Sequence, residues 1–211
     1  MAEPVVFLPG MMCDARVWMP QIIALSTEYA VQVAPITKGE TVEEIARHVL
    51  TQLPERFALA GLSMGGIVAM EMLRVAPERV TRVALFDTNC QQELPNVAAA
   101  REPQIVAVRS GRLPDVMKDV VLPEQLAPGP QRLQVLNAVM DMGLYLGADV
   151  FIRQSRALQK RPDQQGTLRR AKTPALIACG EYDTRTPPRI RDDLEHGVRH
   201  QMCHELVPAR R

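Results

Sequence analysis

The sequence predicts an α/β protein with a mostly parallel sheet of about six strands, crossover helices and a helical insertion. Up to residue 90, short apolar runs alternate strictly with segments of helical periodicity, a pattern typical of parallel strands joined by helices. From residue 91 to 170 only helical periodicity is found, and a strand-like run resumes at 174–179. At 211 residues the chain is long enough for one domain with a sizeable core.

The first half of the chain divides into elements at clear signals. Apolar runs predict strands at 5–8, 31–34, 57–60 and 80–86. Helical spacing predicts helices at 15–25, with Asp14 as N-cap, and at 42–53, with Thr41 as N-cap and Glu44 completing a capping box. A third helix follows Ser63 directly and ends near Pro77.

The second half begins with the insertion. Its helical segments are expected at 97–109, 114–121, 131–146 and 150–159, separated by Pro and Gly. We expect residues 1–90 and 171–211 to form the core, and residues 91–170 to form a cap over a pocket at the end of the sheet. The side chains expected to line that pocket, or else to pack inside the insertion, are Met117, Met140, Met142, Leu144 and Tyr145.

Composition points to a small-molecule substrate. The net charge of +1 provides no field for nucleic acid or an anionic membrane, and the scattered Arg and Lys are expected on solvated faces. No apolar run reaches about 18 residues, and no basic and then apolar leader precedes the first strand. The four cysteines lie far apart without a C-x-x-C pair, so we expect buried thiols and a cytoplasmic location.

The strongest chemical signal is the stretch G-L-S-M-G at residues 61–65, between a strand-like run and a helical one. A serine at such a turn is held in a strained conformation, and the small Gly61 and Gly65 let strand and helix pass closely. The turn exposes the hydroxyl of Ser63 and leaves the backbone N–H of Met64 at a helix N-terminus. The structural alternative is a glycine-rich turn without chemistry.

A serine nucleophile needs a base and an acidic group that orients the base. Acidic residues in loops after strands can supply the second group, because the turn at Ser63 opens at the carboxyl edge of the sheet. Asp87 and Asp183 both qualify. Asp183, in a turn-rich loop beyond a strongly apolar strand, is favoured over Asp87, which can instead cap the next segment.

Three segments resemble the α/β-hydrolase superfamily: FLPGMM at 7–12, GLSMGG at 61–66 and CGEYDTRTPP at 179–188. They occur in the order typical of that fold, and the resemblance extends over nearly the whole chain. It implies that the backbone N–H groups of Met11 and Met64 form an oxyanion hole. Pro9 stands where the family usually has His, a change that leaves a backbone donor intact. The reaction that the resemblance implies needs no cofactor, and no metal site is expected.

The family's base follows the last strand. Of the four histidines, His48 is expected to be structural, while His196, His200 and His204 lie in the tail. A curtailed last strand at 198–202 would place His204 at its end, which favours His204 as the base. The tail lacks the apolar character and closing helix of the family, so we expect a shortened or altered C-terminus.

Other interpretations of the tail remain open. The spacing i, i+4, i+8 of His196, His200 and His204 would align them on one helix face as metal ligands, with Cys203 nearby, although Gly197 interrupts such a helix. The same histidines can also be solvent-exposed without a role.

The resulting hypothesis is a serine hydrolase that cleaves a small carboxylic ester, thioester or lactone through an acyl-enzyme on Ser63. Asp183 and His204 complete the triad, and transfer to an acceptor other than water is a narrower variant. The alternative hypothesis is a protein of the same fold that binds a small ligand but catalyses no reaction, because its tail supplies no base. A homodimer is one way to cover the sheet edges.

Overall fold

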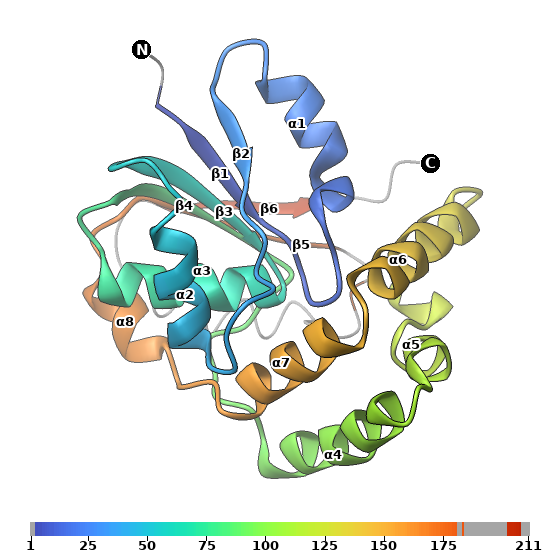
Figure 1. Ribbon diagram of the computed structural model, residues 1–211. Coiled ribbons are helices and arrows are strands. Elements are labelled where there is room, and N and C mark those ends of the chain that lie inside the picture. Colours follow the sequence, from blue (N-terminus) through green and yellow to red (C-terminus); the bar gives the residue numbers. More distant parts are fainter. Residues whose placement is uncertain (1–2, 181–182, 184–201, 208–211) are drawn as a thin grey trace.

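A computed structural model describes residues 3–180, residue 183 and the backbone of residues 202–207 (Figure 1). From the sequence, a further helix is expected from about residue 188 to 196; this segment lies outside the described residues, as do His196 and His200.

The core is a parallel sheet of six strands in the order β2-β1-β3-β4-β5-β6. This confirms the predicted α/β class and the parallel sheet. The strands are β1 (Val5–Leu8), β2 (Val31–Val33), β3 (Phe57–Leu62), β4 (Val80–Phe86), β5 (Ala175–Gly180) and β6 (Met202–Val207).

The helices follow the predicted order, with two additions among the described residues. The segment 15–25 is a 3₁₀ turn followed by an α-helix. The periodicity predicted neither the short 3₁₀ helix η2 nor α8, which precedes β5. The helical elements are η1 (Ala15–Trp18), α1 (Met19–Leu25), α2 (Val42–Leu50), α3 (Met64–Val75), α4 (Pro95–Arg109), α5 (Leu113–Val120), η2 (Pro123–Gln125), α6 (Arg132–Leu146), α7 (Ala148–Gln159) and α8 (Gln165–Arg170).

Strand order and handedness decide which face each helix covers. The chain moves from β1 outward to β2, and then returns past β1 to β3, β4 and β5. Right-handed crossovers place α1 on one face and the connections after β2, β3 and β4 on the other. Contacts of α3 with both α2 and α8 agree with this arrangement. The order reverses between β1 and β3, the position where α/β sheets open a crevice at their carboxyl edge.

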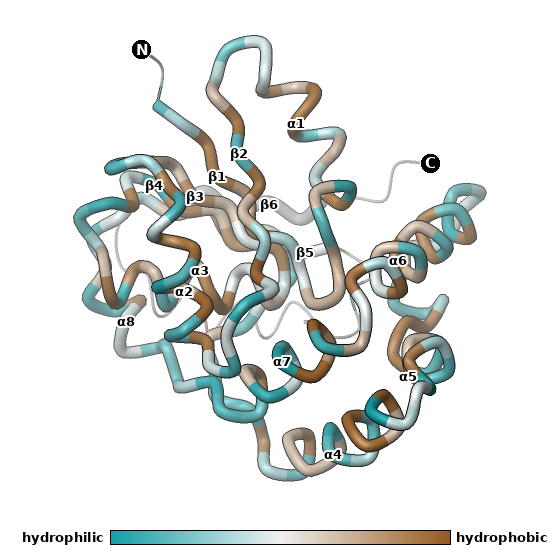
Figure 2. The backbone as a smooth tube through the Cα atoms, in the orientation of Figure 1, coloured by the Kyte–Doolittle hydropathy of each residue, from teal (hydrophilic) through white to brown (hydrophobic). Residues whose placement is uncertain are grey.

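The main core lies between the sheet and the helices α2, α3 and α8. Helix α3 is buried on all sides from Met64 to Leu73, as expected for a helix enclosed by a sheet and two neighbours. Helix α2 is amphipathic, and in Figure 2 its turns alternate between hydrophobic and hydrophilic colour. Its inward residues are Val42, Ile45, Ala46, Val49 and Leu50.

The N-terminus of α2 corrects one detail of the sequence analysis. Thr41 Oγ1 accepts a hydrogen bond of 3.1 Å from the Glu44 N–H, as predicted for an N-cap. The Glu44 carboxylate, however, accepts from the N–H of Glu40 at 2.8 Å, one residue before the cap. The reciprocal pairing of a capping box is therefore displaced by one residue.

The last strand also differs from the expectation. It was placed at 198–202, but β6 runs from Met202 to Val207, with Ile177 paired to His204. His204 therefore lies inside the strand and not beyond its end. β6 lies at the end of the strand order and pairs with β5 alone. The apolar character typical of a strand inside a parallel sheet is therefore not required of it.

Within the described part of the chain, no single helix is long and apolar enough to cross a membrane. Helices α6 and α7 reach the necessary length and apolar composition only together, and a bend of 99° separates them.

Candidate active site

Ser63 lies at the sharp turn between β3 and α3. Its φ of 52° and ψ of −114° are a strained combination for a residue with a side chain. A Cβ on Gly61 would lie 2.4 Å from the Gly65 carbonyl oxygen, and a Cβ on Gly65 would lie 2.3 Å from the Leu8 carbonyl oxygen. Only glycine fits at these two positions, because the opposing atoms belong to the backbone.

The backbone of Ser63 is held from the neighbouring strand. Its N–H donates to the Phe86 carbonyl at 2.9 Å, and its own carbonyl accepts from the hydroxyl of Thr88 at 2.7 Å. The Ser63 side chain is exposed, makes no cap, and has no hydrogen-bond partner within the described part of the chain. Several interactions therefore hold the serine backbone in place, and no described residue bonds to its hydroxyl.

The loop after β1 runs beside this turn. Met12 has a φ of 54°, and its N–H donates to the Gln154 side chain on α7 at 2.9 Å. The amide of Gln154 in turn donates to the Ile36 carbonyl at 3.0 Å, so α7 is tied to two loops of the core. Among the described residues, nothing accepts a hydrogen bond from the N–H of Met11 or of Met64. Two N–H donors that no described residue pairs with therefore line the same cavity as the serine.

A cavity of about 440 Å³ opens above Ser63, a volume typical of small-molecule sites. The floor is the sheet edge, with Met11, Met12 and Met64, and the walls come from α4, α5 and α7. Figure 1 shows these helices beyond the carboxyl ends of the strands. Of the methionines and neighbours expected to line the pocket, Met117 does so, whereas Leu144 and Tyr145 are exposed to solvent.

Asp87 and Asp183 lie next to each other at the ends of β4 and β5. Asp87 Oδ1 accepts the Gly180 N–H at 2.7 Å, and the two carboxyl groups are within hydrogen-bonding reach. Asp87 also adopts a positive φ of 44°. Burial, assisted by the Asp183 charge, raises the pKa of Asp87 to about 6 against the effect of the Gly180 bond. The two acids that the sequence left as alternatives therefore form one pair.

The histidines are described only in part. The backbone of His204 pairs with Ile177, which lies beside Leu85, and Leu85 lies beside Gly61. His204 is therefore two positions short of the row across the sheet that holds Asp87 and Ser63. His48 lies on α2, where its ring contacts the Gln52 amide at 3.0 Å, away from the cavity. Within residues 3–180 and 183, no group of three potential metal ligands is found.

Three charged residues in the cavity wall were not predicted from the sequence: Glu93, Arg101 and Arg161. Arginines were expected on solvated faces, but Arg101 and Arg161 are mostly buried, with side chains 17% and 11% exposed. Neither periodicity nor a motif marks them, because they come from a loop, a helix face and a second loop that meet only in the fold.

Comparison with solved structures identifies the architecture. A thermophilic esterase from Thermogutta terrifontis matches with a TM-score of 0.86 and 22% identity over 99% of this chain and 82% of its own. An enol-lactonase from Burkholderia xenovorans matches with a TM-score of 0.83 and 24% identity over 97% and 83%. The chain has the α/β-hydrolase fold. The resemblance inferred from the three sequence segments is thereby confirmed.

Sequence comparison adds relatives that carry one name. A pimeloyl-[acyl-carrier protein] methyl ester esterase from Vibrio parahaemolyticus is 25% identical over 92% of this chain and 82% of its own. A protein of the same name from Legionella pneumophila is 34% identical, but over only 36% of this chain and 34% of its own. No protein-family model matches the chain.

Proposed function

We propose that the protein is a serine hydrolase that cleaves a small carboxylic ester, thioester or lactone. The observation that carries the proposal is Ser63, strained at φ 52° and placed at the floor of a cavity with its hydroxyl unbonded in the described structure. Sequence relatives named as methyl ester esterases and a structural neighbour named as an enol-lactonase support the same class of reaction.

The reaction begins with attack of Ser63 Oγ on the substrate carbonyl carbon, while His204 accepts the hydroxyl proton. The N–H groups of Met11 and Met64 then donate to the oxyanion of the tetrahedral intermediate. Collapse of the intermediate expels the alcohol or thiol, which takes its proton from the imidazolium. Water attacks the acyl-enzyme by the same route and releases the acid.

The acid of the triad is Asp183 in this proposal, with Asp87 as its neighbour. Because burial raises the pKa of Asp87 to about 6, Asp87 binds a proton as the pH falls below that value. A protonated Asp87 can donate a hydrogen bond to the neighbouring carboxyl group of Asp183 and so fix the position from which Asp183 orients an imidazole. Asp87 acts as a positioning residue for Asp183.

The competing proposal is a ligand-binding protein without turnover. It is favoured by one observation, the position of His204 inside β6, since the base of a triad is expected past the end of its strand. Under this proposal the cavity above Ser63 binds a small ligand, and no side chain of the tail takes up the serine proton.

Hydrolysis of p-nitrophenyl acetate and butyrate separates these proposals. Ser63→Ala and His204→Ala should each lower kcat by at least about 10³-fold while the thermal unfolding curve stays cooperative. His200→Ala is the matched control and should retain the wild-type rate. If His204→Ala keeps its rate and His200→Ala loses it, the base is His200; if neither matters, the triad proposal is wrong.

A further inference from the structure

Three charged side chains form a compact cluster in the cavity wall. Glu93 lies in the loop after β4, Arg101 on α4, and Arg161 in the loop after α7. Glu93 accepts a bond of 2.7 Å from Arg101 Nε and lies 3.3 Å from an Arg161 terminal nitrogen. The Glu93 side chain is only 5% exposed. Both arginines therefore share one buried carboxylate.

The cluster is not fully satisfied. Arg161 Nε is buried and makes no hydrogen bond in the described structure. Burial lowers the pKa of Arg161, and the nearby positive charge of Arg101 acts in the same direction, opposed by Glu93. A guanidinium that is desolvated and only partly paired is costly in the folded protein unless another anion completes its hydrogen bonds.

The charges of the lining do not cancel. Glu93, Arg101 and Arg161 are the charged side chains among the described residues that line the cavity, which leaves one net positive charge. The remaining wall is apolar or neutral, including Asn89 and Gln104. A ligand with one negative charge would neutralise the wall, whereas a dianion would reverse its sign.

The cluster also adjoins the proposed reaction centre. A terminal nitrogen of Arg101 lies 3.9 Å from the sulfur of Met11, whose N–H is one of the two proposed oxyanion donors. Ser63 and the cluster line the same cavity of about 440 Å³. One small molecule can therefore contact both.

We propose that Arg101 and Arg161, which Glu93 holds in place, bind a carboxylate on the substrate. The inference rests on the proposed function, and narrows its substrate to an ester or lactone that also carries a carboxylate, such as a monoester of a dicarboxylic acid. A planar carboxylate matches the fork of a guanidinium and can accept from its two terminal nitrogens together. Its single negative charge would neutralise the net positive charge of the cavity wall.

Binding is tested without turnover by calorimetry with hexanoate and its neutral isostere hexanamide. The wild type should bind hexanoate about 10- to 100-fold more tightly, the range expected for hydrogen bonds between ionised groups. Arg161→Gln should abolish this preference and leave hexanamide binding within about twofold. Glu93→Gln, which raises the net charge of the wall, should keep or increase the preference.

The matched control is Arg156→Gln on α7. Arg156 pairs with the half-exposed Glu102 and does not line the cavity, so its loss should leave the hexanoate preference unchanged. Unfolding curves accompany each variant; if Arg161→Gln does not fold, Arg101→Gln replaces it. A folded wild type that binds neither compound, or binds both equally, overturns the proposal, as does an Arg161→Gln variant that keeps the preference.

Kinetics separate this inference from the proposed function. The wild type should cleave the monoethyl ester of adipic acid with a kcat/KM about 10- to 100-fold above that of ethyl adipamate, in which an amide replaces the carboxylate. Equal cleavage of both esters would refute the carboxylate site and leave the hydrolase standing. Preferential binding of hexanoate without cleavage of any ester would leave the site standing and refute the hydrolase.

Discussion

Gly65 lies where strand, first loop and helix meet, and an added methyl group would have no room. It would lie 2.3 Å from the Leu8 carbonyl oxygen and 2.5 Å from that of Pro9. Gly65→Ala should therefore destabilise the protein by about 2 kcal/mol or more, although alanine is the better helix former. The loop that carries Met11 follows Pro9 directly, so the esterase rate should fall as well.

Gly143 on α6 is the matched control for this substitution. A Cβ there would meet only the end of the Met117 side chain, at 2.2 Å, and that end can move. Gly143→Ala should change the free energy of unfolding by less than about 1 kcal/mol. Urea denaturation of both variants measures the two free energies of unfolding. Equal losses would contradict the claim that backbone contacts leave no room for a side chain at Gly65.

Asp87 is expected to make the free energy of unfolding depend on pH. Its pKa is raised from 3.8 to about 6 in the folded state, chiefly by burial. A raised folded pKa favours the protonated form, so the stability it contributes is complete below about pH 4 and is lost as the pH rises through 6. Asp87→Asn keeps an oxygen for the Gly180 N–H and cannot ionise.

The difference in unfolding free energy between Asp87→Asn and the wild type should therefore change by roughly 1 to 3 kcal/mol between pH 4 and pH 7, in favour of the variant. Urea denaturation across this range measures it. A difference that stays constant with pH would show that the environment of Asp87 does not disfavour its charge.

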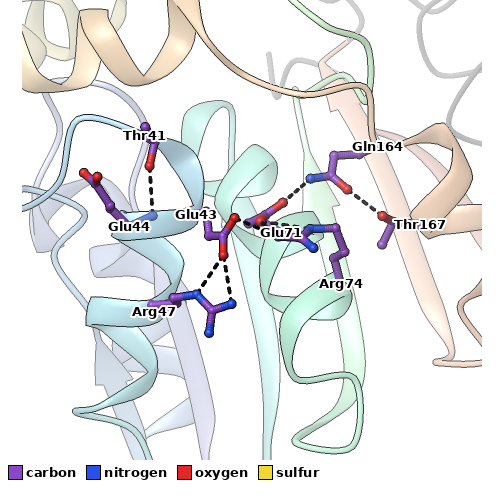
Figure 3. A network of polar contacts seen from close by, with 8 residues as sticks. All are labelled: Thr41, Glu43, Glu44, Arg47, Glu71, Arg74, Gln164 and Thr167. Carbon is purple, nitrogen blue, oxygen red and sulfur yellow. Dashed lines mark hydrogen bonds and ion pairs between the residues drawn. The ribbon is translucent and has the colours of Figure 1, made fainter.

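At the scale of elements, a buried carboxylate joins three helices on one face of the sheet (Figure 3). Glu71 on α3 is 1% exposed and pairs with Arg74 at 2.6 Å. Its second oxygen accepts from the amide of Gln164, which precedes α8 and itself accepts from Thr167 at 2.6 Å. Arg74 extends the network to Glu43 on α2 at 3.1 Å.

Glu71→Ala should cost about 3 kcal/mol or more of unfolding free energy, because it leaves the Gln164 amide without its acceptor and Arg74 without its buried partner. Glu43→Ala removes only a solvent-exposed carboxylate from the same network, and should cost less than about 1 kcal/mol. Thermal and urea unfolding of the two variants gives the comparison. Similar small losses for both would show that the network does not hold α8 on α3.

At the scale of the whole molecule, local signals predicted the order of elements but not every contact among them. Strand β4 (Val80–Phe86) and helix α2, which Thr41 caps, could be located from the sequence because each has its own periodicity and boundary residues. The strand β6 was misplaced, since an edge strand takes its position from pairing with β5 and carries little pattern of its own.

Part of the candidate site was likewise predictable from the sequence, and part was not. The elbow at Ser63 was predictable because glycine spacing and the strand-to-helix transition are both local in sequence. The pairing of Asp87 with Asp183, and the cluster of Arg101 and Arg161 on Glu93, depend on parallel strands and loops that only the fold brings together. No spacing rule connects residues so far apart in the chain.

The central claim is that Ser63 is an activated nucleophile. Intact-mass detection of covalent labelling by a fluorophosphonate probe tests it without a guess at the substrate. We predict one adduct on the wild type, none on Ser63→Ala, and retained labelling on the cavity variant Arg161→Gln. A folded wild type that stays unlabelled, or a Ser63→Ala variant that is labelled as readily as the wild type, would contradict the claim.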